Sequence, residues 1–258
     1  MNRIDAKFNG LRDAGRKGFV GYLTAGDPDL ETSEKNIRLA IENGLDVLEL
    51  GVPFSDPTAD GPTIQEAAQN SLKKGMTVKK VLGMVSNLRK DYESLPIVLF
   101  GYANPFFRYG YDKICADAAE AGVDGMLIVD MPFEEADEIR GSMKSNGLHF
   151  IQLVAPTTPR ERAEVILKDA EGFVYYIMVK GVTGARADVA SDVNEKVAVL
   201  SECTGLPVAV GFGVSSGDQA AEAAKAADAV VVGSALIKAA REGRIDALSA
   251  EIRAALDK

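Results

Sequence analysis

The sequence has few of the side chains that build the commonest catalytic and metal centres. It contains one histidine, two cysteines and no tryptophan among 258 residues. A zinc site made of several histidines is therefore excluded. Cys115 and Cys203 each lie in a helix-like context that contains alanine, which indicates reduced, partly buried thiols and not a disulfide scaffold.

Long apolar runs and basic runs are also missing. No run is long enough to span a bilayer, and the charged N-terminal segment, residues 1–19, lacks the apolar block of a signal peptide. The net charge is -9 and no basic run is present to offset phosphate charge, so we expect neither a nucleic-acid nor a membrane partner. We expect a soluble, cytoplasmic protein.

Short apolar runs rich in β-branched residues recur along the whole chain, and each predicts a β-strand. Amphipathic segments such as 31–44 and 132–147 separate them, with apolar residues at helical spacing and glycine or asparagine near the end. The eight predicted strands are 19–26, 46–51, 97–102, 125–130, 149–156, 173–179, 207–213 and 229–234.

Strands that alternate with helices in this way predict a parallel sheet, and eight units in about 250 residues are typical of a closed (β/α)₈ TIM barrel. We expect a single domain over residues 1–258. A doubly wound sheet is the alternative, but no early GxGxxG turn supports it. Residues 4–15 predict an extra N-terminal helix that covers the barrel floor. The loops after strands 2 and 6 are long and should lie on the C-terminal face, where barrel enzymes place their chemistry.

Two carboxylates follow the second strand. Glu49 lies near its C-terminal end and Asp60 on the long loop, so both can face one substrate at the barrel mouth. Glu49 could instead be a buried carboxylate held by hydrogen bonds, and Asp60 a turn or cap residue before Pro62. Asp56, in the sequence SDP, is better explained as a turn former or surface contact than as a second base.

Other catalytic groups are limited. The lone His149 begins the fifth strand, on the face opposite the mouth, which excludes a Ser-His-Asp triad there. A Schiff-base aldolase would need a lysine in the mouth, and Lys180, after the sixth strand, is the candidate. Because a glycine follows at once, Lys180 can equally be a flexible loop residue.

Glycines follow the last two strands, at Gly211, Gly213 and Gly233. Their backbone N–H groups, together with the partial positive charge of the following helix N-termini, predict the phosphate site usual in such barrels. The same glycines could merely permit tight turns.

Apolar residues at the strand ends would line the mouth, although each could simply be part of the core. With a phosphate site beside it, this slot would suit a phosphorylated polyol attached to a flat aromatic ring. The lining residues are Tyr22, Phe100, Tyr102, Leu127, Tyr175 and Phe212.

At these residues the sequence resembles the family of tryptophan synthase α subunits, and the resemblance covers essentially the entire chain. The motifs that carry it, in order, are LELGVPFSDPTADGPTIQ (48–65), APTTP (155–159), GVTGAR (181–186), VGFGVS (210–215) and VVGSA (231–235).

The resemblance implies a retro-aldol cleavage of indole-3-glycerol phosphate to indole and glyceraldehyde 3-phosphate, without metal or cofactor on this chain. It matches Glu49 to the general acid/base that protonates the indole ring at the carbon bearing the glycerol chain. It matches Asp60 to the carboxylate that stabilises the indole N–H while positive charge develops there.

The resemblance also implies a substrate pocket. Gly184, Gly213, Gly233 and Ser234 would hold the phosphate, and Thr183 would close the loop after the sixth strand over Asp60. The indole or glycerol portion would contact the apolar members of the mouth, namely Tyr22, Phe100, Leu127, Tyr175 and Phe212. Tyr22 departs from the family pattern, in which phenylalanine is common at this position.

A partner is implied as well: a β subunit that carries pyridoxal phosphate and receives indole, in an α2β2 assembly. Its docking surface would include the segment from Pro53 to Asp56, with Asn104, Pro105 and Pro132 on the same rim. A freestanding lyase that supplies free indole is the alternative.

Overall fold

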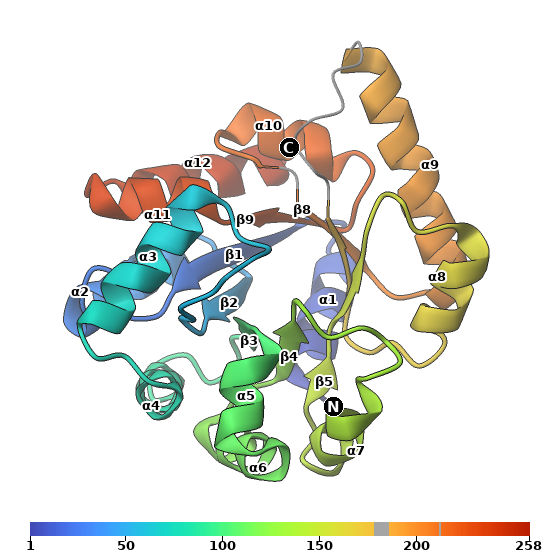
Figure 1. The fold of residues 1–258 in the computed structure, drawn as a ribbon. Helices are drawn as coiled ribbons and strands as arrows, with labels where there is room; N and C mark the ends of the chain where they lie inside the picture. Colours follow the sequence, from blue (N-terminus) through green and yellow to red (C-terminus); the bar gives the residue numbers. More distant parts are fainter. Residues whose placement is uncertain (178–185, 212) are drawn as a thin grey trace.

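The apolar runs form parallel strands at the centre of the molecule, and helices surround them (Figure 1). The computed structural model describes residues 1–177, 186–211 and 213–258, and within 186–193 the backbone alone. The strands in this part of the chain are β1 (Gly18–Thr24), β2 (Val47–Gly51), β3 (Ile97–Gly101), β4 (Gly125–Ile128), β5 (His149–Phe150), β6 (Gln152–Val154), β7 (Val174–Ile177), β8 (Val208–Gly211) and β9 (Ala229–Val232).

The sheet forms a nearly closed barrel, which confirms the predicted TIM barrel. Its strand order is β5-β4-β3-β2-β1-β9-β8-β7-β6, with every pair parallel. The two ends of this order, β5 and β6, are halves of one predicted strand that divides at Ile151. Phe150 pairs with Met126 of β4, whereas Gln152 pairs with Val174 of β7. The doubly wound alternative is therefore wrong.

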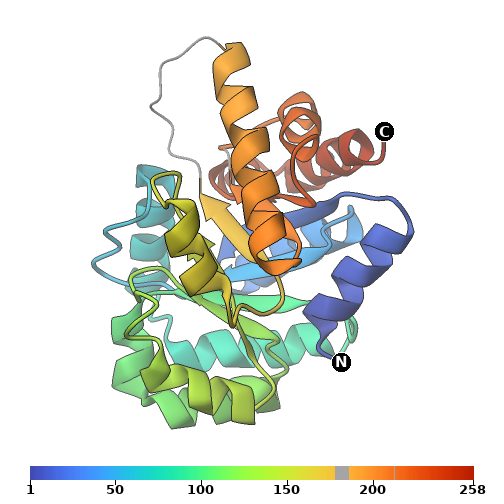
Figure 2. The same cartoon turned by 90° about the vertical axis from the view of Figure 1, so that its right-hand side faces the viewer.

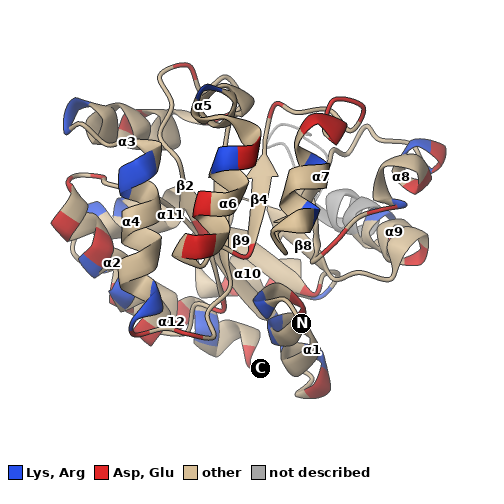
Figure 3. Cartoon of the chain, turned by 90° about the horizontal axis from the view of Figure 1, so that it is seen from below, with Lys and Arg blue, Asp and Glu red and all other residues tan. Residues whose placement is uncertain are grey.

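Helices cover the outside and the floor of the barrel. They are α1 (Arg3–Asp13), α2 (Leu30–Glu42), α3 (Pro62–Lys73), α4 (Val78–Arg89), α5 (Ala103–Tyr109), α6 (Tyr111–Ala121), α7 (Asp137–Ser145), α8 (Arg160–Leu167), α9 (Arg186–Thr204), α10 (Gly217–Ala224), α11 (Ser234–Arg241) and α12 (Ile245–Leu256). In Figure 3 the basic and acidic residues are interspersed on these outer helices and their loops.

The helix α2 shows how the sequence sets its ends. The side chain of Asp29 accepts a hydrogen bond from the backbone N–H of Thr32, which caps the N-terminus. The helix ends at Glu42 with Asn43 as its C-cap, and Gly44 follows with a φ of 103°, a conformation that favours glycine.

The predicted N-terminal helix, α1, closes the barrel floor. Its buried residues Ile4, Phe8 and Leu11 join the cluster inside the barrel, and the rings of Phe8 and Phe173 lie 5.3 Å apart. Figure 2 shows α1 at one end of the strands, opposite the loop that follows β2. His149 belongs to this floor, because its Nε2 lies 3.0 Å from the carboxylate of Asp5 on α1.

Candidate active site

Glu49 points into the barrel, two residues after Val47 of the interior cluster. Successive side chains of a strand alternate between its faces, so these two side chains share one face. The side chain is fully buried, and among the described residues neither of its carboxyl oxygens has a hydrogen-bond partner. Burial alone raises the pKa of Glu49 to about 8.

This arrangement bears on the two interpretations of Glu49. A structural carboxylate inside a protein is normally paired or hydrogen-bonded, because burying an ionised group is costly. Glu49 has neither form of compensation within the described residues, so it is stable there as a neutral acid. A neutral carboxylic acid at the mouth of a barrel can donate a proton to a substrate.

Asp60 is half-buried on the loop 52–61 between β2 and α3. It does not cap α3, since Gly61 is the N-cap residue and Pro62 begins the helix. Burial raises the pKa of Asp60 to about 6, while a hydrogen bond with the side chain of Tyr102 opposes that rise. Asp60 is therefore mostly ionised at neutral pH, whereas Glu49 is mostly protonated.

Both acids lie near enough to the same two tyrosines to affect their ionisation. The negative charges of Asp60 and Glu49 contribute, after burial, to raising the pKa of Tyr22 and the pKa of Tyr175. The ring of Phe100 lies between these tyrosines, 5.0 Å from the ring of Tyr22 and 6.4 Å from the ring of Tyr175.

The slot continues onto the neighbouring strand, because Leu127 is fully buried inside the barrel and Phe100 pairs with it in register. The predicted lining residues Tyr22, Phe100, Leu127 and Tyr175 thus come together. Thr183, Gly184, Phe212 and the alternative base Lys180 lie outside the described residues.

The two helix N-termini predicted to bind phosphate differ in whether a side chain caps them. Gly233 precedes α11, whose first residue is the exposed Ser234, and no side chain caps this helix terminus within the described part of the chain. A Cβ atom added at Gly233 would lie 3.5 Å from Cβ of Tyr22, which places this terminus beside the slot. Free backbone N–H groups at a helix N-terminus suit a phosphate.

The helix after β8 is not equally open. Gly213 has a φ of 65° and is exposed, but α10 is capped by Ser216, and the N–H of Gly217 donates to the Glu251 carboxylate at 2.6 Å. Of these two helices, only α11 therefore has an N-terminus without a side-chain cap within the described residues.

The predicted docking rim is exposed only in part. Asp56, Asn104 and Pro132 are exposed and Pro105 is half-buried, but Pro53 is buried beneath its loop. The rim also carries a residue that the sequence did not single out: Phe107 of α5 is 62% exposed, one of the few large apolar side chains on the described surface. An aromatic residue in a short helix gives no sequence signal of exposure.

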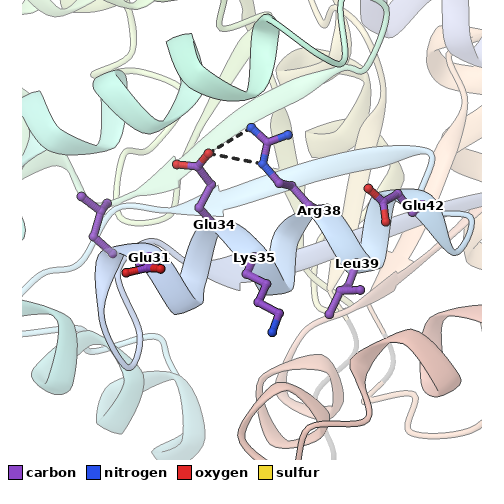
Figure 4. A pocket seen from close by; sticks show the side chains of 7 residues that line it. Glu31, Glu34, Lys35, Arg38, Leu39 and Glu42 are labelled. Carbon is purple, nitrogen blue, oxygen red and sulfur yellow. Dashed lines mark hydrogen bonds and ion pairs between the residues drawn. The ribbon is translucent and has the colours of Figure 1, made fainter.

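Two hollows lie elsewhere on the surface. One of about 620 Å³ runs along α2 and is lined by Leu30, Glu31, Glu34, Lys35, Arg38, Leu39 and Glu42 (Figure 4). Another, of about 380 Å³, lies beside α1 at the floor and includes Arg12, Arg16 and Lys17. Neither contains a predicted site residue.

The described residues contain no group of three or more His, Cys, Asp or Glu side chains that could hold a metal ion. None of the helices in this part of the chain is both long and apolar enough to cross a membrane.

Comparisons with known proteins agree with one another. The sequence pattern of the family described as "Tryptophan synthase alpha chain" matches residues 8–256. The tryptophan synthase alpha chain of Geobacter sp. (strain M21) is 49% identical over 238 residues, which cover 92% of this chain and 89% of that protein. The corresponding chain of Caulobacter vibrioides is 48% identical over 236 residues, covering 92% and 86%.

Solved structures show the same likeness. The crystal structure of the tryptophan synthase alpha chain from Legionella pneumophila has a TM-score of 0.91 and 37% identity, and covers 100% of this chain and 98% of that chain. A structure from Aquifex aeolicus VF5 has a TM-score of 0.92 and 41% identity, with 99% of each chain covered.

Proposed function

Since this chain belongs to the tryptophan synthase alpha chain family, lyases that cleave indole-3-glycerol phosphate, we propose that Glu49 and Asp60 divide the chemistry between them. Glu49 protonates the indole ring at the carbon bearing the glycerol chain. Asp60 stays ionised and stabilises the ring N–H as positive charge develops on the ring. The observation that carries the proposal is the carboxyl group of Glu49, which is fully buried and has no hydrogen-bond partner among the described residues, and which burial keeps protonated at neutral pH.

The bond-breaking step then follows without a metal or an imine. Protonation makes the ring an electron sink, so the bond from the ring to the glycerol chain can break and return its electron pair to the ring. The chain carbon that was bonded to the ring carries a hydroxyl group, which becomes the aldehyde of glyceraldehyde 3-phosphate. The carboxylate of Glu49 accepts the proton of that hydroxyl group. The products are indole and glyceraldehyde 3-phosphate, and Glu49 is again protonated.

The substrate would lie between the aromatic slot and α11. The rings of Tyr22, Phe100 and Tyr175 and the side chain of Leu127 would contact the indole, and the phosphate would be held by Gly213, Gly233 and Ser234. Thr183, Gly184 and Phe212 complete this proposed pocket, as the resemblance implies. The open N-terminus of α11 beside Tyr22 supports this orientation.

We further propose that the chain works as one barrel domain over residues 1–258, without a cofactor of its own. Its partner is a tryptophan synthase β subunit with pyridoxal phosphate, in an α2β2 assembly that docks on the rim near Asp56, Asn104, Pro105 and Pro132, above the buried Pro53. A reducing, cytoplasmic location is part of the same proposal. The free Cys115 and Cys203 support it.

The test is indole release from indole-3-glycerol phosphate by the purified chain and two isosteric variants. Glu49→Gln removes the proton but keeps the shape, so we expect turnover to fall by about 10² to 10⁴, the range for a lost general acid/base, with substrate still bound. Asp60→Asn should be similarly severe, because an amide supplies no negative charge. Near-normal turnover by Glu49→Gln would refute the assignment.

A lysine variant separates this mechanism from the Schiff-base alternative. Lys180→Ala should keep most of the activity, and borohydride added with substrate should trap no adduct. Covalent labelling at Lys180 would favour the aldolase instead.

A further inference from the structure

Tyr102 connects the barrel wall to the loop that carries Asp60. It is the first residue after β3, and its side chain is buried. Its ring packs against the ring of Phe54 on the loop, with 5.4 Å between the centroids. Its hydroxyl oxygen lies 3.0 Å from the backbone nitrogen of Ala59. The same hydroxyl is close enough to the side chain of Asp60, the next residue of the loop, to lower the pKa of that carboxyl group.

The direction of both hydrogen bonds follows from the chemistry of the groups. A backbone N–H can only donate, so the hydroxyl oxygen of Tyr102 accepts from Ala59. An ionised carboxylate can only accept, so the single hydroxyl hydrogen of Tyr102 is left available to the Asp60 carboxylate. The phenol thus uses both of its functions on adjacent residues of one loop.

Other contacts of the loop act on its backbone. The amide of Gln65 donates to the backbone carbonyl of Asp60 at 2.8 Å, and the N–H of Asp60 itself donates to the carbonyl of Pro57 at 3.2 Å. Within the described residues, Tyr102 is the group whose interaction with the carboxylate itself lowers its pKa. With its oxygen held by Ala59, the phenol is therefore placed to direct the carboxylate.

We propose that Tyr102 is a positioning residue for the lyase reaction, which holds the loop 52–61 at Ala59 and orients the Asp60 carboxylate toward the ring N–H of the substrate. This role rests on the proposed function of Asp60. Burial and the charge of Asp60 raise the pKa of the Tyr102 hydroxyl, so it remains a donor throughout the working pH range. Its hydrogen bond favours the ionised form of Asp60, which is the form that the reaction needs.

The test is Tyr102→Phe, which keeps the ring and its contact with Phe54 but removes the hydroxyl. We expect kcat/KM to fall about 10- to 100-fold, the effect of losing a hydrogen bond to a charged group. The pKa of Asp60, followed directly by carboxyl ¹³C NMR, should rise relative to that of the unmodified chain. The acid limb of the pH–rate profile should move to higher pH with it.

The matched control is Tyr109→Phe on α5. The hydroxyl of Tyr109 also donates to a carboxylate, that of Asp117, at 2.6 Å, but this pair lies on the outer helices. Tyr109→Phe should leave both kcat/KM and the Asp60 titration unchanged. In an Asp60→Asn background, Tyr102→Phe should cause little further loss of kcat/KM, because the carboxylate on which the hydroxyl acts is already absent.

The outcomes separate the two proposals. An active chain whose kcat/KM and Asp60 titration are both unaffected by Tyr102→Phe would overturn the role of Tyr102 and leave the function intact. The role of Tyr102 would also be overturned if Tyr102→Phe lowered activity by the same factor in the Asp60→Asn background as in the unmodified chain. A chain with no lyase activity, with or without a β subunit, would overturn the function, and the NMR titration would still report whether Tyr102 donates to Asp60.

Discussion

Two carboxyl groups on one strand–loop segment differ because their surroundings differ. Glu49 is sealed inside the barrel without a polar partner among the described residues, and Asp60 is half-buried with one phenol to donate to it. Burial raises the pKa of both groups, to about 8 for Glu49 and to about 6 for Asp60. At neutral pH this leaves one acid and one carboxylate, as the proposed reaction requires.

Glu49 does not serve stability at working pH. Its pKa is higher in the folded chain than its ordinary value of 4.5, so between about pH 4.5 and 8 the folded state keeps a proton that the unfolded state releases. The free energy of unfolding therefore falls as the pH rises through this window. A group that costs stability at neutral pH is better explained by function than by packing.

At the scale of the element, β2 holds Glu49 by packing closely against β1. Gly51 follows Glu49 on the same face, and a Cβ atom there would lie 2.3 Å from the hydroxyl oxygen of Tyr22 and 2.6 Å from its Cζ. The ring of Tyr22 is buried and packs edge-on against Phe100, so it has little room to move. Glycine at position 51 is what lets the tyrosine ring lie across the strand end.

We therefore predict that Gly51→Ala lowers the free energy of unfolding by about 1–3 kcal/mol, the usual cost of overpacking a core, and reduces lyase activity. Urea unfolding and indole release measure the two effects. Gly83→Ala on α4 is the control, because an added Cβ there meets no atom within 4 Å. A helical glycine replaced in open space should leave the chain unchanged or slightly more stable. Equal stability of Gly51→Ala and the unmodified chain would contradict the packing argument.

Some features of the strands and helices could be predicted from the sequence, and others could not. The strands could be predicted because buried parallel strands are continuously apolar, and Glu49 could be placed in the mouth from the side-chain alternation of its strand. The division of the fifth predicted strand at Ile151 could not be predicted, because it depends on a change of pairing partner from β4 to β7. Nor could the sequence reveal that Glu251, far along the chain on α12, satisfies the N–H of Gly217.

Contacts of single side chains were the least predictable part of the site. Tyr102 could be assigned to the mouth from its position at a strand end, but its hydrogen bonds to Ala59 and Asp60 depend on how the loop folds back. The burial of Pro53 depends on the same loop.

At the scale of the whole molecule, the barrel separates stability from chemistry. The floor is sealed by α1 and anchored by the contact of His149 with Asp5, while the acids, the aromatic slot and the open terminus of α11 gather at the opposite end of the strands. The exposed rim with Asp56, Asn104 and Phe107 lies on loops and a helix that follow β2 and β3. A partner that docks there would sit over the mouth.

We predict that the isolated chain is slow and that a β subunit raises its lyase rate by favouring the closed state of the mouth. Reciprocity then requires that a glycerol-phosphate analogue bound to this chain tighten its hold on the β subunit, which titration calorimetry with and without the analogue measures. Phe107→Ser should weaken partner binding, whereas Val165→Ser, which changes another exposed apolar residue on α8, should not. Equal affinity in both titrations, with no rate increase, would indicate a freestanding lyase.

The pH dependence of kcat/KM tests the acid/base assignment most directly, because it reports the ionisations of the free enzyme. A protonated Glu49 and an ionised Asp60 predict a bell-shaped profile, in which activity is lost below about pH 6 as Asp60 gains a proton and above about pH 8 as Glu49 loses one. The alkaline limb is decisive, because the phosphate of the substrate is already fully ionised there. Activity that stays constant from pH 7 to pH 10 would contradict a protonated Glu49 as the catalytic acid.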